Sequence, residues 1–251
     1  MNLNEMTDLK NPMRNAFAPL NGGGDPEIHV ARFCFKSEYV LNHIRFLNEK
    51  VATALRPLVN EPIPWPPIFD YALCNGDDIH LQHDGAYELF LRILTERDKD
   101  LITNSEVGEF LRHKSIFHLD LAMAAILCAL LGSKEISGNS LISAIGGNCL
   151  QFGIQVGGLP EKWFVVNAEP PVGRVHEPHS RESCLGAFGD SALLEGFGYG
   201  NLALSYCPSM HQLYEKFISH EIFEMPAKLL LAEHPALKKS HALVGLSVKK
   251  S

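Results

Sequence analysis

Glycine recurs at short intervals between Gly146 and Asn201. Glycine adopts positive φ angles and lets other groups come close, so this stretch must turn tightly in several places. Residues 150–156 alternate between apolar and polar side chains, which predicts a strand with one buried face. Residues 157–160, Gly-Gly-Leu-Pro, predict a turn, and residues 162–167 predict the returning strand. We expect the whole stretch from Gly146 to Asn201 to organise the rest of the fold.

The polar side chains of the hairpin are candidates for ligand contacts. Asn148, Gln151 and Gln155 are expected on one polar face flanked by glycines, where amide groups and free backbone N–H groups could meet a small anionic or amide ligand. The alternative for each Gln is a half-solvated strand with its polar side in water. Asn148, within a Gly-Gly-Asn sequence, either caps the turn or binds a ligand.

A second candidate region begins at Gly189, where a Gly-Asp-Ser turn precedes an apolar segment. Asp190 or Ser191 can cap a helix, and the N–H groups at a helix start attract phosphate or carboxylate. Glu195 would lie one turn further on. Capping alone is the alternative, and the turn by itself favours it over anion binding; the glycines that follow Glu195 predict a brief helix.

A third candidate region is the turn at Asn75-Gly76, followed by Asp77, Asp78 and His80. Asp77 is expected to be the N-cap of a helix that runs to about Arg97. Carboxylates beside a histidine can orient a general base or raise its pKa. The alternative is a capped helix with a solvent-facing histidine. Asp78, His80 and His83 do not match a strong metal motif.

Elsewhere the sequence predicts a strand over 27–35, a helix from Ser37 to about Leu58, a helix over 116–131 and a helix over 209–223. The apolar run at 119–131 contains Asp120 and is too short to cross a bilayer, so it predicts a buried core helix. The lysines near the C-terminus predict a solvated tail.

Composition narrows the function classes. The chain has 251 residues and a formal net charge of −7, with a sequence pI near 5.9. No basic face offsets phosphate charge, so we expect neither a nucleic-acid nor a membrane partner. The six cysteines are scattered without a CxxC pair, and the N-terminus lacks the pattern of a leader, which together predict a cytoplasmic protein with reduced thiols. No Walker A, Rossmann, GxSxG or HExxH motif is present, so no cofactor and no metal is expected.

Two segments carry a family resemblance: GGNCLQFGIQVGGLPEKWF at 146–164 and GDSALLEGFGYGN at 189–201. They resemble the signature segments NGxxFGIxVSGLxxxWF and GDSAITETxGLGG of a bacterial family that includes the AllG-type subunit of oxamate carbamoyltransferase and YahG-like proteins. NGDDIH at 75–80 and FHLDLAMAA at 117–125 are similar to two further family segments. The resemblance covers about residues 14–201.

The resemblance implies an α+β fold in which a helical subdomain in the middle of the chain packs on a glycine-rich mixed α/β portion. The expected division is 1–36 as an N-terminal loop and strand joining the α+β portion, 37–135 as the helical subdomain, and 136–251 as the glycine-rich portion with a C-terminal helix. The implied chemistry is transfer of a carbamoyl group between phosphate and a small amide or amine acceptor, so carbamoyl phosphate is a candidate ligand.

The resemblance also implies roles for particular residues, and we expect the 75–80 turn to meet the 146–201 stretch so that these residues form one site. Asp77, His80 and Asp190 are the expected acid/base or orienting groups. The expected substrate-binding groups are Asn148, Gly157, Gly158, Ser191, Asp78 and Glu195. Carbamoyl transfer passes through an oxyanion, which backbone N–H groups at the two glycines could stabilise.

Departures from the family pattern leave two function classes open. Gly157 stands where the family has Ser, Gly22 where it has Glu, and Gln82-His83 where it has Arg-Asn, and family members are longer. The chain is therefore either a carbamoyltransferase-like or amide-processing enzyme acting on a small anionic metabolite, or a non-catalytic subunit or ligand-binding module derived from a longer enzyme. In both cases a homo-oligomer or a partner subunit is expected to complete the site.

Overall fold

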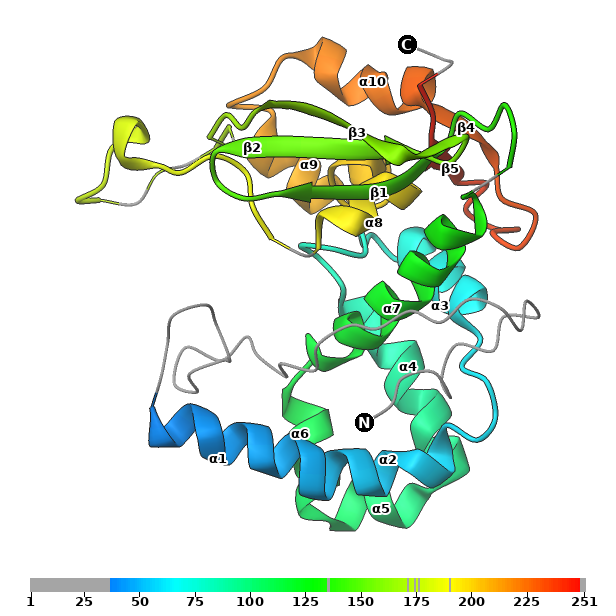
Figure 1. Cartoon of the computed structure of the whole chain (residues 1–251). Helices are drawn as coiled ribbons and strands as arrows, with labels where there is room; N and C mark the ends of the chain where they lie inside the picture. The colour runs from blue at the N-terminus through cyan, green and yellow to red at the C-terminus, as the bar shows by residue number, and fades with distance from the viewer. Residues whose placement is uncertain are drawn as a thin grey trace.

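The computed structural model describes residues 37–134, 136–170, 172–173, 175, 177–189 and 191–248. The expected strand over 27–35 and the expected N-terminal segment 1–36 lie outside these residues. Within the described part of the chain, a group of helices precedes a three-stranded sheet, and shorter helices and a two-stranded sheet follow (Figure 1). This arrangement confirms the α+β fold class.

The helical group begins with one long, nearly continuous helix. Its parts are α1 (Glu38–Phe46), a π-helical turn (Leu47–Val51) and α2 (Ala52–Leu58). The Ser37 side chain caps it by accepting a hydrogen bond from the Val40 N–H at 3.2 Å. The predicted helix from Ser37 to Leu58 is therefore confirmed. The other helices of this group are α3 (Trp65–Cys74), α4 (Asp84–Arg97), α5 (Lys99–Asn104), α6 (Glu106–His113) and α7 (Phe117–Gly132).

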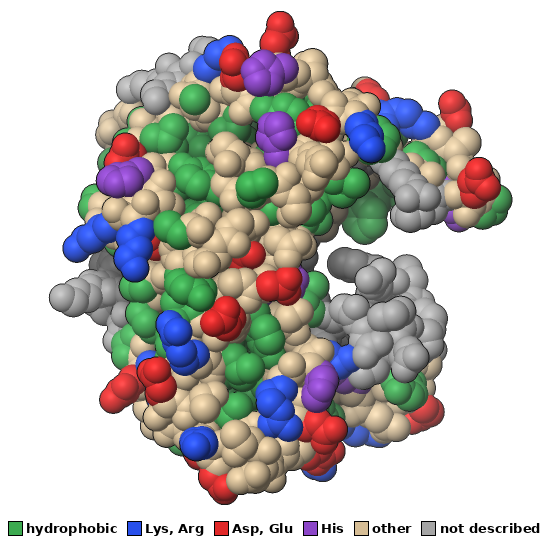
Figure 2. Space-filling model, turned by 180° about the vertical axis from the view of Figure 1, so that it is seen from behind, with side chains coloured by type: hydrophobic (Ala, Val, Ile, Leu, Met, Phe, Trp, Pro, Cys, Tyr) green, Lys and Arg blue, Asp and Glu red, His purple; other side chains and the backbone are tan. Residues whose placement is uncertain are grey.

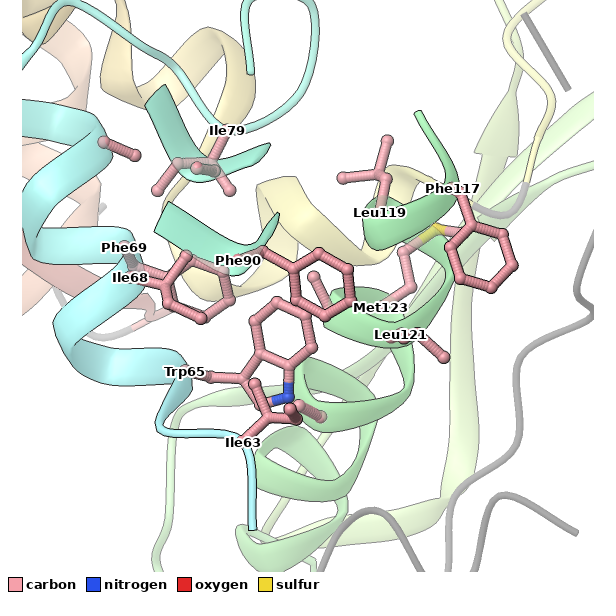
Figure 3. Packing of buried hydrophobic residues seen from close by; sticks show 14 of the residues in the cluster. Ile63, Trp65, Ile68, Phe69, Ile79, Phe90, Phe117, Leu119, Leu121 and Met123 are labelled. Carbon is pink, nitrogen blue, oxygen red and sulfur yellow. The ribbon is translucent and has the colours of Figure 1, made fainter. Parts of the chain in front are cut away.

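Helix α7 is the centre of the core. Most of its side chains are buried, including those of His118 and Asp120, as the prediction of a buried core helix requires. Beside it, Trp65 stacks on Phe69 and on Phe90 with ring centroids 5.7 and 5.8 Å apart (Figure 3). Among the described residues no single helix is long and apolar enough to cross a membrane; α6 and α7 meet that criterion only as a pair bent by 76°.

The sheet after α7 has the order β1-β2-β3, with β1 (Ile142–Gly147), β2 (Gln151–Val156) and β3 (Leu159–Asn167) all antiparallel. The predicted hairpin is β2 and β3. Its expected polar face is only partly correct, because Gln155 is buried. The Gln155 side chain accepts from Lys134 Nζ at 3.1 Å and donates to the Pro160 carbonyl at 2.8 Å.

The C-terminal part differs from the sequence-based expectation. It contains α8 (Ala192–Phe197), a 3-10 helix η4 (Gly200–Tyr206), α9 (Pro208–Tyr214), α10 (His220–Leu229), β4 (Leu230–Glu233) and β5 (Leu243–Leu246). The single predicted helix over 209–223 is thus two helices. The lysine-bearing segment near 239 is not a solvated tail, because buried Asp70 accepts hydrogen bonds from the backbone N–H groups of Lys239 and Ser240.

The two parts of the molecule share a single core. The sheets lie at one end and α1, α2 and α5 at the other, with α3 and α7 reaching between them (Figure 1). Residues from the C-terminal part, including Leu194 and Tyr199, belong to the same buried cluster as Phe69 and Phe90. The Tyr199 ring lies 5.0 Å from that of Phe69. Seen from behind, the space-filling view shows positive and negative side chains mixed over the visible face (Figure 2).

Candidate functional site

The loop between α3 and α4 is built around the Asp78 carboxylate. Asp78 Oδ1 accepts hydrogen bonds from the backbone N–H groups of His80, Leu81 and Gln82 at 2.8–2.9 Å. Gly76, with a φ of +89°, makes the preceding turn possible. Asp78 is fully buried. Because its Oδ1 accepts three backbone hydrogen bonds, this oxygen holds together the loop that presents His80.

Asp77 caps α4 from a distance. The predicted helix start at Asp77 is wrong, because α4 begins at Asp84 and residues 77–83 form the loop. The Asp77 carboxylate nevertheless accepts from the Ala86 N–H at 2.9 Å, so it satisfies a free donor in the first turn. Burial raises the pKa of Asp77 to about 6, against the lowering effect of these backbone hydrogen bonds.

His80 and Glu195 join two of the sequence-predicted regions. His80 Nδ1 lies 3.2 Å from Glu195 Oε1, and both side chains are partly exposed. Asn201 donates to the same Glu195 oxygen from its backbone N–H at 3.1 Å. The Gly200 N–H donates to the Asp78 carbonyl at 2.7 Å, which ties η4 to the loop. The loop after α3 and the segment around α8 therefore meet.

Gly200 keeps this junction close. Its φ is +62°, and a Cβ atom there would lie 2.1 Å from Glu195 Oε1 and 3.0 Å from His80 Nδ1. Only glycine leaves room for the two side chains to pair. The charges at this junction also act on a residue that the sequence did not single out, Tyr214 on α9. Its pKa is raised by burial and by the negative charges of Asp78 and Glu195.

Three other expected site residues lie elsewhere. Asn148, at the turn between β1 and β2, accepts from the N–H groups of Leu150 and Gln151 and is exposed, so it caps the turn. Gly157 and Gly158 follow the opposite end of β2, and a six-residue strand is roughly 20 Å long. The structure therefore does not bring Asn148 together with these glycines.

The N–H groups of Gly157 and Gly158 are also occupied. They donate to the carbonyls of Leu141 at 2.8 Å and of Asn139 at 3.0 Å. A Cβ atom at Gly157 would lie 2.3 Å from the Ser133 carbonyl, so this glycine is required by close packing. In this structure these two N–H groups offer no proton to an oxyanion.

The turn before α8 is only partly described. Asp190 lies outside the described residues. Ser191 occupies the N-cap position of α8 without a capping hydrogen bond from its side chain. Glu195 is in the first turn of α8, where the sequence predicted it.

The described side chains that hydrogen-bond at this junction are carboxylates, one imidazole and the Asn201 amide. Among the described residues no lysine or arginine side chain hydrogen-bonds to Asp78, His80 or Glu195. Nor does any group of three or more His, Cys, Asp or Glu side chains in that part of the chain fit a metal ion. A carboxylate oxygen accepts hydrogen bonds, so His80 Nδ1–H donates to Glu195, and whenever the ring is neutral its lone pair is on Nε2. The pair has the arrangement of a general base held by a carboxylate.

The fold around this pair recurs in a protein of known structure. The crystal structure of a conserved protein of unknown function from Enterococcus faecalis V583 has a TM-score of 0.72, with 22% sequence identity, and covers 85% of this chain and 55% of that one. The likeness establishes a shared α+β fold.

The sequence places the chain in a family. The model of the family "Oxamate carbamoyltransferase subunit AllG" matches residues 1–191, so the chain belongs to that family. It is 30% identical over 188 residues to the oxamate carbamoyltransferase subunit AllG of Escherichia coli K12, covering 72% of this chain and 45% of the relative. It is 27% identical over 143 residues to the uncharacterized protein YahG of the same organism, which covers 55% of this chain and 30% of that relative. The chain thus spans less than half the length of these relatives.

Proposed function

We propose that the chain is a subunit of a carbamoyltransferase-like enzyme, in which His80 is the general base and Glu195 orients it. The observation that supports this proposal best is the 3.2 Å contact between His80 Nδ1 and Glu195 Oε1, made by two segments that are 115 residues apart. Membership of the AllG family supports the reaction class. The proposed substrate is a small amide metabolite that exchanges a carbamoyl group with phosphate.

The proton balance of this reaction requires a base. The acceptor nitrogen attacks the carbamoyl carbon, and a new C–N bond forms while the C–O bond to phosphate breaks. Phosphate leaves with the electron pair, and the acceptor nitrogen loses its proton to His80 Nε2. The imidazolium formed is stabilised by Glu195, which already accepts a hydrogen bond from the opposite ring nitrogen.

The charge of the site favours a complex over a subunit that acts alone. Phosphate and carboxylate groups are bound by cations and free N–H groups, whereas the described side chains that hydrogen-bond at the junction are carboxylates, one imidazole and the Asn201 amide. We propose that a partner subunit or a second copy of the chain supplies the groups that bind the anionic part of the substrate. Asp190 and Ser191, beside the same segment, remain candidates for substrate contacts.

A turnover assay tests this proposal. The chain, alone and together with the other subunits encoded beside it, is assayed for carbamoyl phosphate formation and consumption with oxamate as the acceptor. We expect His80→Gln to lower kcat at least about 100-fold and Glu195→Gln about 10-fold or more. His220→Gln is the matched control, because His220 forms an exposed pair with Glu224. Wild-type turnover by His80→Gln would refute the proposed base.

A non-catalytic, ligand-binding subunit is the second candidate. It is favoured by the occupied N–H groups of Gly157 and Gly158, which leave the expected oxyanion donors engaged in the fold. In that case carbamoyl phosphate or oxamate would bind, and turnover by the assembled enzyme would be insensitive to His80→Gln.

A further inference from the structure

Next to the His80 loop lies a group of polar side chains that the proposed function does not use, one fully buried and two half-buried. His83 and Tyr87 are one turn apart at the start of α4, and His118 is the second residue of α7. The His118 ring lies 5.3 Å from that of His83 and 5.7 Å from that of Tyr87. We name these three residues the His118 cluster.

The cluster contains polar atoms without partners. In the part of the chain that the structure describes, His83 Nδ1, Tyr87 Oη and His118 Nε2 are buried and form no hydrogen bond. The second carboxylate oxygen of Asp78, in the adjoining loop, is buried and unpaired as well. Folded proteins pair nearly all buried polar atoms, because an unpaired one is costly. Three such atoms on rings that contact one another indicate a bound group that the chain itself does not provide.

The hydrogen-bonding roles of these atoms define that group. His118 Nδ1 lies 2.5 Å from the Ser115 carbonyl, which only accepts, so Nδ1 carries the proton and Nε2 is an acceptor. Burial lowers the pKa of His118 to about 3, which keeps the ring neutral. Burial raises the pKa of Tyr87 to about 12, so its hydroxyl remains a donor.

We propose that the His118 cluster binds a primary amide, –CO–NH2, whose nitrogen donates one N–H to His118 Nε2 while its carbonyl accepts from Tyr87 Oη. The neutral His118 acceptor requires a group that carries a proton, which a carboxylate or a fully ionised phosphate lacks. The described residues offer no set of metal ligands. The Phe90 ring, 6.0 Å from that of His118, forms an apolar wall beside the amide.

The bound amide is taken to be part of the carbamoyl acceptor, so this proposal rests on the proposed function. Binding measurements nevertheless test the amide site without turnover. His83 is the N-cap of α4 and follows His80 by three residues, so the cluster adjoins the His80 loop. An amide bound to His118 and Tyr87 would therefore lie near the general base. The group bound there is the nitrogen-bearing end of the acceptor.

Oxamate and pyruvate are the probes, because pyruvate replaces the amide NH2 of oxamate by a methyl group of similar size. Dissociation constants are measured by calorimetry on the chain with the subunits that copurify with it. We expect oxamate to bind at least tenfold more tightly than pyruvate. Tyr87→Phe and His118→Asn should reduce that ratio to near one, whereas Tyr71→Phe, which removes a hydroxyl that donates to Glu88, should leave it unchanged.

Folding and binding should respond in opposite directions to Tyr87→Phe. The Tyr87 hydroxyl has no partner, so its removal should leave the Tm of the unliganded protein equal or higher, while oxamate binds less tightly. A ratio near one in the wild type, a ratio unaffected by both variants, or no binding of either probe would overturn the proposal. If His80→Gln binds oxamate normally but does not turn it over, the amide site and the general base are both supported. If turnover depends on His80 but oxamate and pyruvate bind with equal dissociation constants, only the proposed amide site is refuted.

Discussion

Two buried aspartates in this protein have opposite effects on stability as the pH changes. Asp77 has a pKa raised to about 6, mainly by burial, so the folded state holds its proton more tightly than the unfolded state does. Asp70 is buried too, and burial alone would raise its pKa. Hydrogen bonds from Ser240 and Lys239 outweigh that effect and lower the pKa.

For Asp77 the expected result is a loss of stability as the pH rises from about 4 to 6, because the folded protein must then bury a charge. Asp77→Asn retains an oxygen that can accept from the Ala86 N–H and cannot ionise. Urea unfolding between pH 4 and 7 should show Asp77→Asn gaining stability relative to the wild type over that interval. A constant difference between the two proteins would contradict the raised pKa.

For Asp70 the stabilising contribution is present above about pH 4, the unfolded value, and is lost as the pH falls through the lower folded value. Asp70→Asn removes the charge that accepts from Lys239 and Ser240, so we expect a loss of about 2 kcal/mol at pH 7. The deficit should shrink below pH 4 in the same unfolding series. An equal deficit at pH 3 and pH 7 would show that the charge plays no part.

At the scale of elements, Gly200 determines how closely η4 approaches the His80 loop. Gly200→Ala places a methyl group against the Glu195 carboxylate and strains a φ of +62°. Gly138→Ala is the matched control, since its φ is +72° and nothing lies within 4 Å of the added atom. Each variant should lose about 1 kcal/mol through backbone strain, but only Gly200→Ala should lower turnover, by at least about tenfold. Equal turnover by both variants would show that the His80–Glu195 contact is not limiting.

Elements with local signals were predictable from the sequence, and elements set by distant partners were not. Ser37 and the apolar spacing after it predict the first long helix, and alternation over 150–156 predicts β2. The start of α4 was misplaced because Asp77 caps it across a loop that is closed by Asp78. The β4–β5 hairpin was missed because Leu230 and Leu243 begin two strands of only four residues, too short for a clear alternation.

At the scale of the whole molecule, one predicted contact between distant segments is present in the structure and another is absent. The contact of the 75–80 turn with the segment at Glu195 was expected and is present. Asn148 and Gly157 were expected to join it, but β2 separates them from each other, and the Gly157 N–H bonds to Leu141. Residue types and glycine positions predict candidate chemistry, but they do not reveal which N–H groups the fold has already used.

The shared core explains how segments so distant in the sequence are held together. Tyr199, one residue before Gly200, is buried against Phe69 of α3, and its pKa is raised well above the usual value by burial. The aromatic contact fixes η4 relative to the helix that leads into the His80 loop. The site geometry therefore depends on packing between the helical part and the C-terminal part of the chain.

A double-mutant cycle on turnover tests most directly whether His80 and Glu195 act as one unit. Turnover is measured for the wild type, His80→Gln, Glu195→Gln and the double variant in the assembled enzyme. If Glu195 acts only by orienting His80, the double variant should be no slower than His80→Gln alone. Losses that multiply, so that the double variant is slower than either single variant by the full product, would contradict the account.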